Sequence, residues 1–258
     1  MTRGDMYSNK FFSAILTSLK MLPVFRISEG VENLEQNYQT FDKCKDIFKK
    51  NGIVLIFSEG RCINEWHLRP LKKGTARLAI SSWHDGIPLK ILPTGINYQS
   101  FRKFGKNVEI NFGDVLNEED IDHTNGYGQT ILDFNEKLRE KLQPLVAEIP
   151  MNNQQEIKNR FKIKVSALKK ILLFFPAGLG WLFHAALYIP VKKYTGKKSG
   201  HNDHYDSIRV ALLFGAYPFY LMIIAAGVSL VTSGWWGWGI FLIFPFCAWS
   251  YLQLKQQF

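Results

Sequence analysis

Hydrophobic positions in residues 1–155 follow two patterns, a helical spacing and short unbroken runs. Apolar residues recur every three or four positions in residues 31–50 and 127–146, which predicts two amphipathic helices. Residues 53–57 are all apolar, a pattern typical of a strand buried on both faces of a parallel sheet. Helices that alternate with such strands predict an α/β fold with a largely parallel sheet flanked by helices.

Shorter elements complete this predicted domain, which spans residues 1–155. Residues 11–19 have apolar side chains at helical spacing, and residues 72–83 are also predicted to be helical. Residues 89–98 and 107–112 are predicted strands. Pro144 is a potential breaker late in the helix of residues 127–146.

The last third of the chain, residues 156–258, is basic and apolar and predicts a membrane region. Residues 171–191 carry no charge and are bracketed by lysine pairs, and a stretch of this length can span a bilayer. Pro176 and Pro190 interrupt it and both ends are basic, which favours a re-entrant or in-plane segment with both ends on one side. The alternative, a buried core helix, is disfavoured by the flanking lysines.

Two further uncharged stretches, residues 210–232 and 240–252, enclose a glycine-rich turn with three tryptophans. This pattern predicts a transmembrane helical hairpin over residues 210–252. Its ends would be cytoplasmic, and its tryptophan-rich tip would lie at the far interface. We therefore expect a membrane protein whose folded domain lies on the cytoplasmic side.

Charge and cysteine content limit the binding partners and the kinds of site that are expected. The formal net charge is +10, and residues 157–202 contain ten Lys or Arg but no Asp or Glu. Basic residues that flank apolar runs favour anionic membrane lipids as partners and disfavour nucleic acid. Three widely spaced cysteines without a CxxC pair exclude a disulfide framework and a zinc ribbon, and no metal site is predicted.

A candidate ligand site follows the apolar run of residues 53–57. Ligands of α/β folds collect where strands end, and Ser58, Glu59, Gly60 and Arg61 stand at that point. Arginine can hold phosphate oxygens, and glycine lets a backbone approach a ligand closely. Taken alone, the pattern also fits a solvated turn with a surface ion pair.

Four short blocks extend this observation, because they stand in the order and at the spacing of a known family. They are residues 21–26 (MLPVFR), 57–62 (FSEGRC), 70–76 (PLKKGTA) and 88–93 (PLKILP). The chain thus resembles the glycerolipid acyltransferase family, which includes 1-acylglycerol-3-phosphate acyltransferases, over about residues 1–115. Ser58 departs from the proline usual in that family, and Arg61 and Cys62 replace its usual Thr-Arg or Thr-Ser.

The resemblance implies a function in phospholipid biosynthesis. An acyl chain would pass from acyl-CoA or acyl carrier protein to a glycerol-phosphate-type acceptor such as lysophosphatidate, without a further cofactor. It implies that Arg26 contacts the acceptor phosphate and that Glu59, Gly60, Arg61 and Lys73 also bind substrate.

The catalytic block of that family, His-x4-Asp, does not precede the other blocks in this sequence. In the family its histidine is the general base for the acceptor hydroxyl. A literal match, His201 to Asp206, lies far downstream and is interpreted as coincidence. Cys62 is interpreted as a half-buried thiol and not as a nucleophile. We therefore expect that an N-terminal portion is missing and that this chain transfers little. The alternative function is a non-catalytic membrane module that binds anionic lipid.

Overall fold

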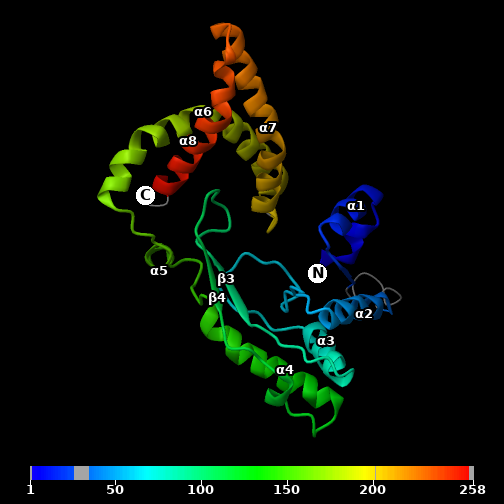
Figure 1. Cartoon of the computed structure of the whole chain (residues 1–258). Helices are drawn as coiled ribbons and strands as arrows, with labels where there is room; N and C mark the ends of the chain where they lie inside the picture. The colour runs from blue at the N-terminus through cyan, green and yellow to red at the C-terminus, as the bar shows by residue number, and fades with distance from the viewer. Residues whose placement is uncertain (1, 26–34, 201, 256–258) are drawn as a thin grey trace. The chain divides into compact units, whose positions relative to one another are not determined.

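The structure is a computed structural model and describes residues 2–25, 35–200 and 202–255 (Figure 1). Its contacts group these residues into two compact units. The first unit comprises Met1–Cys62, His67–Gly95 and Asn111–Ala147, and the second comprises Ile63–Trp66, Ile96–Ile110 and Glu148–Phe258, each as far as it is described. The predicted division into an acyltransferase-like domain of residues 1–155 and a membrane region of residues 156–258 stays a prediction.

The described part of the first unit contains four α-helices. They are α1 (Lys10–Ser18), α2 (Glu35–Lys49), α3 (Lys73–His84) and α4 (Tyr127–Leu142). Short 3-10 turns occur at Gly4–Tyr7, Glu118–Asp120 and Gln143–Leu145. The breaker prediction is confirmed, since Pro144 lies in the 3-10 turn that follows α4.

The core of the first unit is formed mainly by one face of α3 packed on one face of α4. Its fully or nearly buried members are Ala76, Ala79, Ile80, Trp83, Leu116, Ile121, Ile131, Phe134 and Leu138. Trp83 also donates a hydrogen bond from Nε1 to the carbonyl of Leu89, 2.9 Å away. The apolar positions predicted for the helix of residues 127–146 therefore face this core, as their spacing requires.

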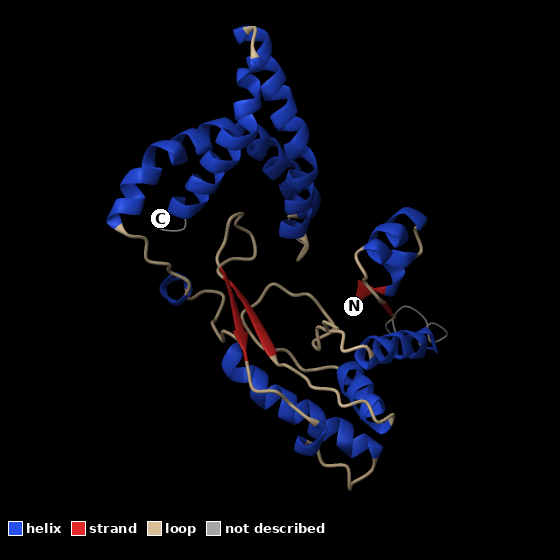
Figure 2. Cartoon of the chain, viewed as in Figure 1, coloured by secondary structure: helices blue, strands red, loops and turns tan. Residues whose placement is uncertain are grey.

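The prediction of a largely parallel sheet is wrong. The described strands form two separate pairs: β1 (Thr2–Arg3) lies parallel to β2 (Pro23–Val24), and β3 (Thr94–Tyr98) pairs with β4 (Val108–Phe112) (Figure 2). Residues 53–57 belong to no described strand, and Ile53 and Phe57 are 95% and 63% exposed. An unbroken apolar run indicates a need for burial, but it does not specify a hydrogen-bonding neighbour.

The strand predicted over residues 89–98 is shorter than expected. Only Thr94–Tyr98 forms a strand, because Ile91 makes an isolated antiparallel bridge with Leu116 instead. The strand predicted at residues 107–112 is confirmed as β4.

The second unit is dominated by long helices. After α5 (Gln154–Arg160) come α6 (Ala167–Ser199), α7 (Tyr205–Thr232) and α8 (Ile240–Lys255), with a 3-10 turn at Trp235–Gly239. In the described chain, three segments are long and apolar enough to cross a membrane: Ala167–Ser199, Tyr205–Thr232 and Trp235–Lys255. α6 is continuous through Pro176 and Pro190 and follows a curved path (Figure 1). Whether α6 spans the bilayer or lies in its plane stays a prediction.

Close backbone contact holds α6 to α8. A Cβ at Gly180 would lie 2.1 Å from the carbonyl oxygen of Cys247, so only glycine fits there. His184 ties α6 to α7, because its Nε2 lies 3.1 Å from the hydroxyl of Tyr217. The predicted tryptophan turn joins α7 to α8, and Trp235 is 83% exposed there.

Candidate functional site

The turn at residues 58–61 is fixed to the start of α3. The backbone N–H of Lys72 donates to the carbonyl of Ser58 (2.7 Å), and the hydroxyls of Ser58 and Thr75 lie 2.9 Å apart. Gly60 has a φ of 67°, in the left-handed region that favours glycine. The turn is therefore held beside the N-terminus of this helix.

Glu59 is half-buried and partly engaged. Its Oε1 accepts a hydrogen bond from the backbone N–H of Arg69 at 3.0 Å, which orients the carboxylate. No hydrogen bond or ion pair of its Oε2 is found among the described residues, so that oxygen can accept a hydrogen bond from a ligand hydroxyl.

Arg61 and Lys73 supply the positive charge of this site. Both are exposed, and within residues 2–25, 35–200 and 202–255 neither forms an ion pair. Lys73 is the first residue of α3, whose N-cap residue Lys72 makes no side-chain capping bond. Two cations beside an uncapped helix N-terminus form a local field that attracts a phosphate.

The structure thus brings together four of the five predicted substrate-binding residues, Glu59, Gly60, Arg61 and Lys73. The fifth, Arg26, lies outside the described residues, so its position beside Glu59 stays a prediction. No group of three or more His, Cys, Asp or Glu side chains that could hold a metal ion is found in the part of the chain that the structure describes.

The other titratable candidates are placed less favourably for catalysis. His201 lies outside the described residues, and Asp206 forms an ion pair with Lys106 in the second unit. Cys62 is exposed, so the expectation of a half-buried thiol is wrong. Cys44 is buried, and burial raises the pKa of its thiol to about 11. Cys44 is therefore a core residue and no nucleophile near neutral pH.

His84 stands beside a carboxylate that is already used. Its Nδ1 is 3.8 Å from Asp85, but Asp85 accepts a hydrogen bond from Lys45 at 2.8 Å. That hydrogen bond is the main reason that the pKa of Asp85 is lowered. Because the Asp85 carboxylate already accepts a hydrogen bond from Lys45, it is a poor partner to orient His84 as a general base.

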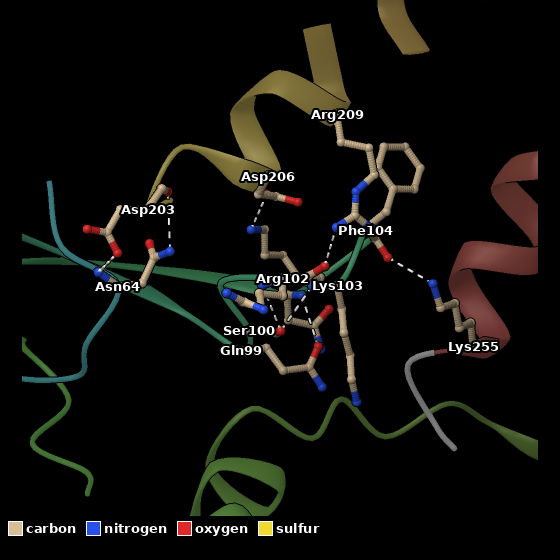
Figure 3. Close-up of polar contacts among 12 residues, drawn as sticks. Asn64, Gln99, Ser100, Arg102, Lys103, Phe104, Asp203, Asp206, Arg209 and Lys255 are labelled. Atoms are coloured by element: carbon tan, nitrogen blue, oxygen red, sulfur yellow. Dashed lines mark hydrogen bonds and ion pairs between the residues drawn. The ribbon is translucent and has the colours of Figure 1, made fainter. Parts of the chain in front are cut away.

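A polar cluster in the second unit was not predicted from the sequence (Figure 3). Arg209 is only 1% exposed and donates to the carbonyl of Arg102 (2.7 Å) and to the hydroxyl of Tyr188 (3.0 Å). Lys255 donates to the carbonyl of Phe104 at 3.0 Å. These bonds attach the loop between β3 and β4 to the start of α7 and the end of α8. The sequence contains one signal for this cluster, because Arg209 stands directly before a long uncharged stretch.

Comparison with known proteins gives the site a context. Residues 1–97 match the acyltransferase family. The chain is also similar to glycerol-3-phosphate O-acyltransferase 1 of Saccharomyces cerevisiae, with 35% identity over 68 residues, which is 26% of this chain and 9% of the yeast protein. No solved structure matches. Residues 1–97 include the turn and the start of α3, and the expected resemblance to glycerolipid acyltransferases is confirmed.

Proposed function

We propose that the turn at residues 58–61 and the start of α3 bind the phosphate end of a glycerol-phosphate-type acceptor in an acyltransferase. The observation that carries this proposal is the grouping of Arg61, Lys73 and an uncapped helix N-terminus within the segment that matches the family. Arg61 and Lys73 would neutralise the phosphate, and Glu59 would accept a hydrogen bond from the acceptor through Oε2.

The reaction would transfer an acyl chain from a thioester donor. The acceptor hydroxyl attacks the thioester carbonyl and forms the new C–O bond of a tetrahedral intermediate. Collapse of this intermediate breaks the C–S bond, and the proton lost by the hydroxyl ends on the departing thiolate. Acyl-CoA or acyl carrier protein would be the donor, and glycerol 3-phosphate or lysophosphatidate the acceptor. The similarity to a yeast glycerol-3-phosphate O-acyltransferase supports an acceptor of this class.

The attacking hydroxyl must lose its proton, and no His-x4-Asp precedes Glu59 in this sequence. General-base catalysis contributes roughly 10²–10⁴-fold, so we expect slow transfer by these 258 residues alone. The same observation favours a second candidate, a membrane module that binds glycerol phosphate or anionic lipid without turnover.

Three apolar helices agree with membrane association of the whole chain. We propose that the acyltransferase segment lies on the cytoplasmic side, because Lys192, Lys193 and Lys255 lie near the ends of these helices. A lysophosphatidate acceptor and its product would then share the membrane to which the chain is anchored.

An acyl-transfer assay separates the two candidates. Purified chain is incubated with radiolabelled acyl-CoA or acyl carrier protein and each acceptor, and the lipids are resolved by thin-layer chromatography. The enzyme is supported if the chain forms product above the protein-free level and if Arg61→Ala needs a higher acceptor concentration to reach the same rate. Arg139→Ala, which removes an exposed arginine of α4, is the matched control. Acceptor binding without product, also when the native upstream coding sequence is included, supports the module.

A further inference from the structure

A polar cavity of about 400 Å³ lies in the second unit, where α6 begins and α8 ends. Its polar lining comes from three places in the sequence: Lys164, Ser166 and Lys169 around the start of α6, Gln253 on α8, and Asn107 before β4. Asn107 is buried and donates to the carbonyl of Phe161 at 2.8 Å, which fixes that wall. The cavity lies outside the residues that match the acyltransferase family.

The charged residues that line the cavity are both cations. Lys169 donates to Gln253 Oε1 at 2.7 Å, while Lys164 makes no hydrogen bond or ion pair with the residues that the structure describes. Glu109, two residues after Asn107, forms an ion pair with Arg160 at 3.3 Å, and Asp206 forms an ion pair with Lys106, the residue before Asn107. An anion entering the cavity would therefore meet two ammonium groups, and no carboxylate is among the described residues that line it.

Further positive charge surrounds the last turn of α8. Lys255 follows Gln253 by two residues and is half-buried, and the positive charges of Arg209, Lys103 and Lys192 also act on it. Like charges repel one another, and a bound anion would reduce this repulsion.

Apolar surface continues from the cavity along α6. Ile163 lines the cavity and is 53% exposed, and in the first turns of α6 Leu168 and Ile171 are 68% and 73% exposed. Soluble phosphate would not use this surface, whereas acyl chains would cover it. We propose that the cavity binds the headgroup of an anionic glycerophospholipid, with Lys164 and Lys169 on its phosphate and its acyl chains along the start of α6. This proposal does not depend on acyl transfer.

Lipid binding to the full chain in a neutral detergent tests the proposal. Native mass spectrometry gives the Kd for dioleoyl phosphatidic acid, for dioleoyl phosphatidylcholine, and for phosphatidic acid competed by glycerol 3-phosphate. We expect phosphatidic acid to bind at least about tenfold more tightly than phosphatidylcholine, because each lost charge-assisted contact weakens binding by about tenfold. We expect no displacement by glycerol 3-phosphate in Arg61→Ala/Lys73→Ala, in which the proposed acceptor site is removed.

Variants locate the binding. K164Q/K169Q should raise the Kd for phosphatidic acid at least about tenfold, and K164R/K169R should retain binding. K158Q/K162Q, which removes two exposed lysines outside the cavity lining, should leave the Kd within about twofold. K164Q alone loses no described contact, so a raised Kd in this variant reports the site without disturbing the fold.

Three results would overturn the proposal. They are equal binding of phosphatidic acid by K164Q/K169Q and K158Q/K162Q, equal binding of phosphatidylcholine and phosphatidic acid, and displacement by glycerol 3-phosphate at equal concentration in Arg61→Ala/Lys73→Ala, in which the proposed acceptor site is removed. The last result would assign the cavity to a free phosphate.

Discussion

Gly60→Ala tests whether the left-handed turn at residues 58–61 forms the acceptor site. Gly60 has a φ of 67°, and a non-glycine residue there costs about 1–2 kcal/mol. The added Cβ would also lie 3.0 Å from Cγ of Lys72, a flexible side chain that can move by the few tenths of an ångström needed. Backbone strain is therefore the main cost, and we expect Tm to fall by roughly 3–8 °C.

If the strained turn forms in only a fraction of Gly60→Ala molecules, the apparent affinity for acceptor falls by that fraction. A strain of 1–2 kcal/mol corresponds to about 5–30-fold weaker binding of glycerol 3-phosphate, measured by equilibrium binding of the radiolabelled compound. Gly60→Asn should recover part of the loss, because asparagine tolerates the left-handed region better than alanine.

Gly86→Ala is the matched control for Gly60→Ala. Gly86 also has a positive φ, 73°, and a Cβ there would meet nothing within 4 Å. It should lower Tm by a similar amount and leave binding of glycerol 3-phosphate unchanged. Equal loss of binding in the two variants, or unchanged binding in Gly60→Ala, would refute the reasoning.

Other predictions concern the cores of the two units. Phe134→Ala should destabilise the first unit by about 3–5 kcal/mol in calorimetry, because a fully buried ring is lost between α3 and α4. Iodoacetamide at pH 8 should modify Cys62 and spare Cys44 until the protein unfolds. Because the folded pKa of Cys44 is raised from 9.0 to about 11, its contribution to stability should fall as pH rises through that window in pH-dependent melting. Gly180→Leu should reduce the yield of folded protein in size-exclusion chromatography, since its side chain would strike the backbone of α8. Gly178→Leu, where a Cβ meets nothing within 4 Å, should leave that yield unchanged.

Amphipathic helices were predictable because apolar residues at helical spacing reflect the burial of one helix face. Ile131, Phe134 and Leu138 recur at helical spacing, and all are buried against α3. The three apolar stretches of the last third were predictable as helices for another reason, because their length and lack of charge are typical of membrane helices.

Pairing between distant segments was not predictable in the same way. The apolar run of residues 53–57 has the pattern of a buried strand. A strand also needs a hydrogen-bonded neighbouring strand, and the pattern does not indicate which segment that would be. The turn after them was located correctly through Glu59 and Gly60, whereas its attachment to Thr75 depends on a tertiary contact. The burial of Arg209 was missed because its acceptors, including the carbonyl of Arg102, are far away in sequence.

The most direct test of the central claim is equilibrium binding of radiolabelled glycerol 3-phosphate, the part that both proposed acceptors share. The account predicts saturable binding that Arg61→Ala/Lys73→Ala weakens by at least about tenfold and that Arg139→Ala leaves unchanged. Because glycerol 3-phosphate is not expected to occupy the cavity at Lys164 and Lys169, K164Q/K169Q should also bind it normally. Binding that is the same in Arg61→Ala/Lys73→Ala as in the unsubstituted chain would contradict the account.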